Sequence, residues 1–232
     1  MISQSPNTTI GLLLSGGLDS SILLGHLLRQ GRRVRPFYVR SGLCWETAEL
    51  DALSRFLKAL DCEPLDQLVV LELPLGDLYN DHWSLTGTGV PSAETPDEAV
   101  YLPGRNALLV IKALLWCHLR GIDQLALAPL QSNPFPDASD SFFKTFSQAM
   151  NTAAAGQVET VRPFSHLDKR EVMLLGRELP LELTFSCIAP RDQLHCGRCN
   201  KCGERQTAFR EAGIDDPTRY VSLPCSTPST TH

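Results

Sequence analysis

Short apolar runs alternate along the chain with longer segments in which apolar positions recur every three or four residues. The apolar runs predict buried strands over 9–14, 34–39, 68–73, 124–128 and 158–161. The periodic segments predict helices over 19–30, 47–60, 106–119, 139–153 and 168–179. Strands that alternate with helices form βαβ units, so we expect an α/β fold with a mainly parallel sheet and helices on both faces.

The stretch 74–100 is different, because Gly, Pro, Thr and Asp dominate it and no periodicity is visible. Long irregular segments inside a compact domain are typical of lids and binding loops. We therefore expect this stretch to border a functional site. The tail 226–232, rich in Pro, Ser and Thr, predicts disorder.

Composition narrows the function classes. The net charge of −5 and the pI of about 5.7 are unlike those of a general nucleic-acid binder, which usually has a basic face. No apolar run approaches the roughly 20 residues that cross a bilayer, and the first nine residues lack a cationic, apolar leader. These features predict a cytoplasmic protein without membrane partners.

The first strand runs directly into SGGLDS, which opens the first predicted helix. Glycines allow a sharp turn and close approach of the backbone, while the free amides and dipole of a helix N-terminus favour an anion. The serine hydroxyls add donors, and Asp19 would either cap the helix or help to orient Mg²⁺. The predicted phosphate-binding residues are Leu14, Ser15, Gly16, Gly17, Leu18, Asp19, Ser20 and Ser21. The alternative is an ordinary strand–turn–helix junction.

Four of the eight cysteines follow a metal-binding spacing, Cys187-x8-Cys196-x2-Cys199-x2-Cys202. Four thiolates suit tetrahedral Zn²⁺ with no open position, which predicts a structural site. The rivals are an iron–sulfur cluster and a redox-active thiol pair. Because four cysteines already fill the site, we expect His195 to lie beside the metal site or to face a substrate. We expect residues 1–185 to form the α/β domain that carries the phosphate loop and 186–232 to form a zinc-binding segment packed on it.

The SGGLDS run is the signature of ATP pyrophosphatases, or PP-loop enzymes, so the chain resembles that superfamily. Within it, residues 163–209 resemble the C-terminal part of 7-cyano-7-deazaguanine synthases, and 101–106, reading YLPGRN, resembles a phrase of the same family. The resemblance in 163–209 rests on Lys169, on 184–187, on the HCGxCxxC block, on Arg205 and on Ala208-Phe209.

The resemblance implies a Rossmann-like fold of the adenine nucleotide alpha hydrolase type and an ATP-dependent carbon–nitrogen ligase. Such enzymes use ATP and Mg²⁺ to adenylate 7-carboxy-7-deazaguanine, and ammonia converts it through an amide to the nitrile of queuosine biosynthesis. The implied catalytic residues are Asp19, Arg105 and Lys169. Tyr38 and Arg105 are carried over as nucleotide contacts, and a homodimer is implied. For Arg105 and Lys169 the alternative is surface salt bridging.

Two segments depart from the family pattern. The stretch 38–46 lacks the family's Tyr-Gly-Gln phrase, and 135–142 has Ala138-Ser139 where the family has Cys-Arg. Loss of an arginine removes a partner for an anion. Asp137, with Asn106, is the predicted substrate-binding pair, because a carboxylate accepts from the donor edge of a guanine-like base. The alternative for Asp137 is a helix N-cap.

Two other functions are also compatible with these sequence features. One is a divergent PP-loop enzyme that acts on another carboxylate or nucleobase, such as a tRNA thiolase or a lysidine synthetase. A thiolase would need a reactive cysteine near ATP, and Cys44 and Cys117 are the candidates. The other is a non-catalytic module that binds zinc and nucleotide.

Overall fold

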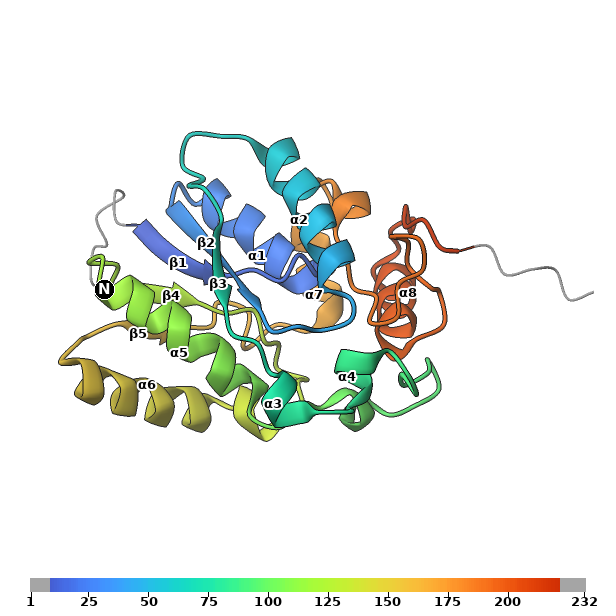
Figure 1. Ribbon diagram of the computed structural model, residues 1–232. Helices are drawn as coiled ribbons and strands as arrows, with labels where there is room; N and C mark the ends of the chain where they lie inside the picture. Colours follow the sequence, from blue (N-terminus) through green and yellow to red (C-terminus); the bar gives the residue numbers. More distant parts are fainter. Residues whose placement is uncertain (1–8, 222–232) are drawn as a thin grey trace, which may run out of the picture.

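A five-stranded parallel sheet forms the centre of the computed structural model, which describes residues 9–221 (Figure 1). The expectation for 226–232 lies outside the described residues. The strand order is β3-β2-β1-β4-β5, and every neighbouring pair is parallel. The strands are β1 (Thr9–Leu13), β2 (Arg33–Arg40), β3 (Val69–Glu72), β4 (Gln124–Ala126) and β5 (Glu159–Val161).

Helices cover both faces of the sheet, which confirms the predicted architecture. One face carries α1 (Leu18–Arg29), α2 (Glu46–Leu60) and α7 (Lys169–Gly176), and its core includes Ile22, Phe56 and Met173. The other face carries α5 (Arg105–His118) and α6 (Asp140–Ala154), and its core includes Val110, Leu114 and Phe143.

Close packing of α5 on the sheet depends on Gly11 in the central strand. A Cβ at Gly11 would lie 2.7 Å from Cys117 Sγ and 2.9 Å from Phe37 Cε2. Since real Cβ atoms do not approach so closely, a side chain at this position would push the helix away from β1. Burial also raises the pKa of Cys117 to about 12, which fits a packing residue better than a reactive thiol.

The stretch 74–100 holds only short helices: α3 (Gly76–Tyr79), α4 (Trp83–Thr86) and the 3₁₀ turn η1 (Asp97–Val100). The prediction of an entirely irregular segment was therefore wrong in detail. Its apolar side chains, with Trp45, Phe185 and the cysteines, form a separate core cluster.

The sequence pattern missed α8 (Asn200–Ala212), which follows the cysteines. Few of its residues are apolar, but Ala208, Phe209 and Ala212 are buried in the core beside α7. The remaining 3₁₀ turns are η2 (Pro136–Ala138) and η3 (Leu181–Leu183).

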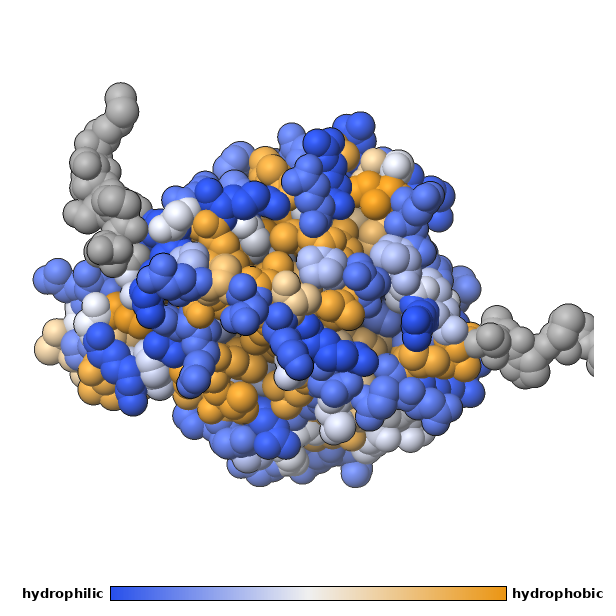
Figure 2. Space-filling model, turned by 90° about the horizontal axis from the view of Figure 1, so that it is seen from above, coloured by the Kyte–Doolittle hydropathy of each residue, from blue (hydrophilic) through white to orange (hydrophobic). Residues whose placement is uncertain are grey.

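The face seen from above is a mosaic of hydrophilic and hydrophobic residues (Figure 2). Such mixing is normal for a folded domain, because polar atoms do not suffice to cover it. Within 9–221, no helix combines the length and apolarity that a bilayer crossing requires.

Candidate functional site

A cavity of about 410 Å³ opens at the carboxyl ends of the strands. Its walls come from the loop after β1, from β2 and α2, from the start of α5, from the segment after β4, and from α7 and α8. The sheet order places β1 between β2 and β4, so the connections from β1 and β4 leave toward opposite faces. Open α/β sheets bind ligands in the crevice at such a switch point.

The predicted phosphate loop forms one wall of this cavity. The backbone turns at Gly16, whose φ of +84° suits glycine, and α1 begins two residues later at Leu18. Ser15 Oγ accepts from the amide of Gly17 at 3.3 Å and lies 3.1 Å from Ser20 Oγ. Because the first amides of a helix have no partner within it, this wall offers donors to an anion.

Two residues of the predicted loop do not reach the cavity. A Cβ on Gly16 would face Leu53 of α2 at 3.2 Å, so Gly16 serves the turn and the packing against α2. Ser21 is fully buried, and its hydroxyl has no hydrogen-bond partner among residues 9–221. The other predicted residues, Leu14, Ser15, Gly17, Leu18, Asp19 and Ser20, line the cavity.

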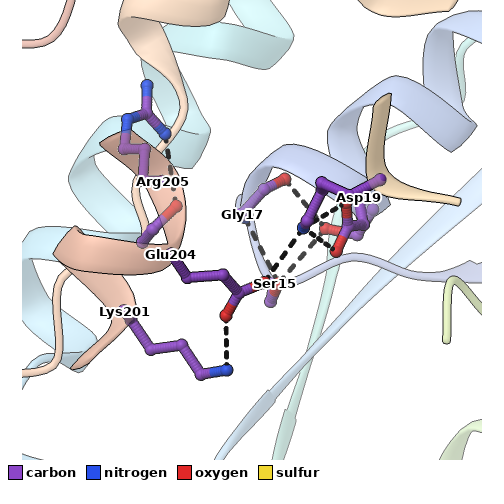
Figure 3. A network of polar contacts seen from close by, with 9 residues as sticks. Ser15, Gly17, Asp19, Lys201, Glu204 and Arg205 are labelled. Atoms are coloured by element: carbon purple, nitrogen blue, oxygen red, sulfur yellow. Dashed lines mark hydrogen bonds and ion pairs between the residues drawn. The ribbon is translucent and has the colours of Figure 1, made fainter. Parts of the chain in front are cut away.

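Asp19 belongs to a network of charged side chains in the cavity wall (Figure 3). Lys169 Nζ donates to both carboxylate oxygens of Asp19 at 2.8 Å and lies 3.0 Å from Glu204 Oε1. Lys201 Nζ contacts Glu204 Oε2 at 2.6 Å. The capping role expected for Asp19 is wrong, because α1 has Gly17 as its N-cap and no side-chain cap.

Burial and neighbouring charges together fix the protonation states of Lys169 and Glu204 in this network. Burial on its own lowers the pKa of Lys169, but Asp19 and Glu204 outweigh it and raise the pKa above its ordinary value. Burial likewise raises the pKa of Glu204, yet Lys169 and Lys201 lower it to about 2. Both groups are therefore ionised at neutral pH, with cations and anions alternating beside the phosphate loop.

Tyr38 of β2 also lines the cavity, and its hydroxyl binds a buried acid. Its hydroxyl donates to Glu49 Oε2 at 2.5 Å. Burial raises the pKa of Glu49 to about 7, against the opposing effects of Tyr38 and Arg105. The guanidinium of Arg105 lies 6.0 Å from the ring centre of Trp45, and its buried Nε has no hydrogen-bond partner in the described part of the chain.

Asn106 and Asp137, the residues predicted to bind the substrate, lie side by side in the cavity wall. Asp137 accepts from the Asn106 amide at 3.0 Å and from its Nδ2 at 3.2 Å, which joins the start of α5 to η2. The alternative role of Asp137 as the N-cap of the helix predicted over 139–153 is wrong, since Ser139 Oγ caps α6 by accepting from the Phe142 amide.

The four cysteines converge at one buried point. Their Sγ atoms all lie within 4.8 Å of one another, and the Cys187–Cys199 and Cys196–Cys202 pairs are 3.9 Å apart. A tetrahedral ion with Zn–S bonds of about 2.3 Å would separate its sulfurs by about 3.8 Å, so the cluster fits such an ion. His195 stays outside this set, with Nε2 accepting from the Ser186 amide at 3.1 Å.

Sequence reasoning missed Glu49, Lys201 and Glu204 as cavity residues. For Glu49 a signal existed: positions 46, 49, 53 and 56 continue one stripe of α2, and the first two are acidic where the core pattern demands apolar residues. Lys201 and Glu204 carried no signal, because they reach the cavity only through the placement of α8.

A protein-family model described as "Queuosine biosynthesis protein QueC" matches residues 9–213. That span includes the phosphate loop, the network of Asp19, Lys169, Lys201 and Glu204, and all four cysteines. The chain belongs to this family. Two curated QueC-family relatives, both named 7-cyano-7-deazaguanine synthase, are each 31% identical to it. The one from Xylella fastidiosa strain M12 aligns over 93% of this chain and 96% of its own length, and the one from Solidesulfovibrio magneticus over 95% and 98%.

Similarity to solved structures is weaker than similarity to the QueC family. The U34-tRNA thiolase NcsA from Methanococcus maripaludis is 15% identical with a TM-score of 0.47, over 89% of this chain and 68% of that one. A score of this size adds nothing to the family assignment, which rests on sequence. Both relatives are named as a synthase, and this chain aligns with 96% and 98% of their length.

Proposed function

We propose that this QueC-family chain is an ATP-dependent ligase that converts 7-carboxy-7-deazaguanine and ammonia to 7-cyano-7-deazaguanine. The observation that carries the proposal is a single cavity that brings the phosphate loop together with Arg105, Lys169 and the Asn106–Asp137 pair. The family membership and the name of the curated relatives support the substrate.

The proposed reaction uses ATP twice, each time to turn an oxygen of the substrate into a good leaving group. A carboxylate is a poor electrophile, so one of its oxygens attacks the α-phosphorus of ATP, and pyrophosphate leaves. Ammonia then displaces AMP to give the amide, whose oxygen is activated by a second ATP before the nitrile forms. The chain has to position the reactants and neutralise the departing pyrophosphate.

The residues of the phosphate loop and the charged residues beside it have separate tasks in this scheme. Ser15, Gly17 and Ser20 present donors to the phosphates, and Arg105 and Lys169 supply positive charge. Mg²⁺, when bound, would neutralise phosphate oxygens. Asp19 is the carboxylate that would hold it, and for this Asp19 must release Lys169, which keeps Glu204 as a partner.

Five further parts of the proposal concern the metal, the ammonia, the assembly, the domains and the location. The cysteine cluster would hold Zn²⁺, the ammonia would come from solution or a partner, and two chains would form a homodimer. Residues 186–232 would act as a segment packed on the ATP-binding domain, 1–185; residues 222–232 and 1–8 lie outside the described part of the chain. The packing is supported by α8 side chains that are buried in the same core as α1 and α7. Cytoplasmic location would keep the cysteines reduced.

The test is to incubate the purified chain with 7-carboxy-7-deazaguanine, ammonium and ATP–Mg²⁺ and to analyse the products by mass spectrometry. We expect the nitrile together with AMP and pyrophosphate. A parallel incubation with other carboxylates examines the divergent branch that the altered 38–46 and 135–142 segments suggest. Absence of the nitrile with intact ATP binding would overturn the substrate but not the nucleotide site.

A further inference from the structure

Glu49 forms part of the cavity wall, and the chemistry above gives it no task. The residue lies in the first turn of α2 and is only 8% exposed. Its Oε2 accepts from the hydroxyl of Tyr38 at 2.5 Å. Within 9–221 this is the single hydrogen bond to its carboxylate, and no lysine or arginine lies within ion-pair distance, so Oε1 is left without a partner.

A carboxylate in this position destabilises the ligand-free protein. Burial penalises the charged form, and the neighbouring Glu46 adds to that penalty, while Tyr38 and Arg105 only partly offset it. Oε1 does not belong to the fully buried polar atoms that lack a partner in the described residues, so this oxygen is open to the cavity. Where such a group lines a cavity, a ligand that supplies donors removes the cost.

The other two buried carboxylates nearby are already used by the protein. Glu46 accepts from the amides of Ser41 and Gly42, the latter at 3.0 Å. Both oxygens of Asp137 accept from Asn106. Glu49 therefore keeps more acceptor capacity than Asp137, the residue that the sequence favoured for reading the base.

Two aromatic side chains in the wall of the same cavity suit a flat ring. Trp45 and Trp83 stack with their ring centres 5.9 Å apart and an interplanar angle of 20°, and both line the same cavity. A guanine-like base offers a ring N–H and an adjacent amino group, which are two donors for a carboxylate. Adenine offers one amino donor beside an acceptor nitrogen, which matches an ionised carboxylate less well.

We propose that Glu49 accepts hydrogen bonds from the ring N–H and the amino group of the guanine-like acceptor, and that it thereby selects this substrate. The inference rests on the proposed function, because it concerns the base that this function requires. Tyr38 is then a positioning residue, since its hydroxyl holds the carboxylate of Glu49 in one orientation.

The test compares Glu49→Gln with wild type at pH 8. The amide keeps an acceptor for Tyr38 but places an N–H where the base presents its own. We expect the KM for 7-carboxy-7-deazaguanine to rise about 10- to 100-fold, the range for losing a hydrogen bond to a charged group, and the KM for ATP to change less than about twofold. Asp51→Asn, an exposed carboxylate-to-amide change on the same helix, is the matched control.

Binding measured without turnover separates this inference from the proposed function. Calorimetric titration of wild type should show about tenfold weaker binding of an analogue without the 2-amino group, and Glu49→Gln should bind both bases equally weakly. An unchanged KM and equal titrations in wild type and variant would overturn the role of Glu49, as would a KM increase confined to ATP. Wild type that binds the base but forms no nitrile would overturn the proposed function alone.

Discussion

Lys169 is held between two acids in the wall of the cavity. Its side chain is 20% exposed and contacts Asp19 and Glu204 together. Surface salt bridges contribute little to stability, because solvent screens them and both side chains lose freedom. This trio instead borders the phosphate loop, where the same charges can exchange partners with a bound polyphosphate and its metal ion.

Replacement of Asp19 by alanine is expected to lower ATP-dependent turnover at least 100- to 1000-fold, a loss typical of removing an electrostatic catalytic group. The chain should stay folded, because Lys169 keeps Glu204 at 3.0 Å and is not left without a counter-charge. Product formation and thermal unfolding should be measured on the same sample, with Asp51→Ala as an exposed control. Turnover near the wild-type rate would remove Asp19 from the catalytic set.

At the scale of elements, apolar periodicity predicted most of the secondary structure. The five strands and the helices α1, α2, α5, α6 and α7 appear where the pattern placed them, with shifts of a few residues at their ends. Shifts were largest where local signals fade, as at α7, which ends at Gly176 rather than 179. A Cβ on Gly176 would lie 2.4 Å from Ile22 Cγ1, so close packing on α1 explains this glycine.

The α8 helix escaped prediction because tertiary contacts define it. Its first turn follows Cys199, its N-cap, and it carries Cys202, so the cysteine cluster fixes where it starts. Lys201 and Glu204 then point to the cavity, while Arg205 donates to Thr184, Ser186 and Thr218 and to the carbonyl of Leu181. Local motifs predicted the phosphate loop and the cysteine cluster. No local pattern shows that α8 places Lys201 and Glu204 in the cavity wall.

Substitution of Cys199 by serine is therefore expected to impair folding and to reduce the yield of folded chain several-fold. Metal-binding energy is largely folding energy, and this residue both belongs to the cluster and begins α8. Elemental analysis should find about one zinc per wild-type chain and much less in the variant. Cys62→Ser, which changes an exposed thiol, is the control. Iron in place of zinc would contradict the assignment of the metal, and a stable variant would contradict its structural role.

The cavity draws on every part of the described chain, which links its electrostatics to the stability of the whole molecule. The loop after β1 and α2 belong to the N-terminal half, α5 and η2 to the middle, and α7 and α8 to the end. Charges gathered there from distant segments meet only on folding. Their pKa values therefore differ between the folded and unfolded states, and stability must depend on pH.

Glu49 and Glu204 should affect this dependence in opposite directions. Glu49 has its pKa raised from 4.5 to about 7, so the folded state keeps a proton that the unfolded state releases, and stability falls as pH rises between these values. The full effect is about 3 kcal/mol. Glu204 has its pKa lowered from 4.5 to about 2, so its contribution is present above pH 4.5 and is lost as pH falls toward 2.

Urea unfolding of wild type and Glu49→Gln from pH 5 to pH 8 isolates the first of these effects. The variant carries no titrating group at position 49, and its amide retains an acceptor for Tyr38. We expect wild type to lose up to about 3 kcal/mol relative to the variant across this range, most of it before pH 7. Two parallel stability curves would mean that the carboxyl of Glu49 ionises in the folded protein as readily as in the unfolded chain. Burial in the cavity wall would then not perturb it.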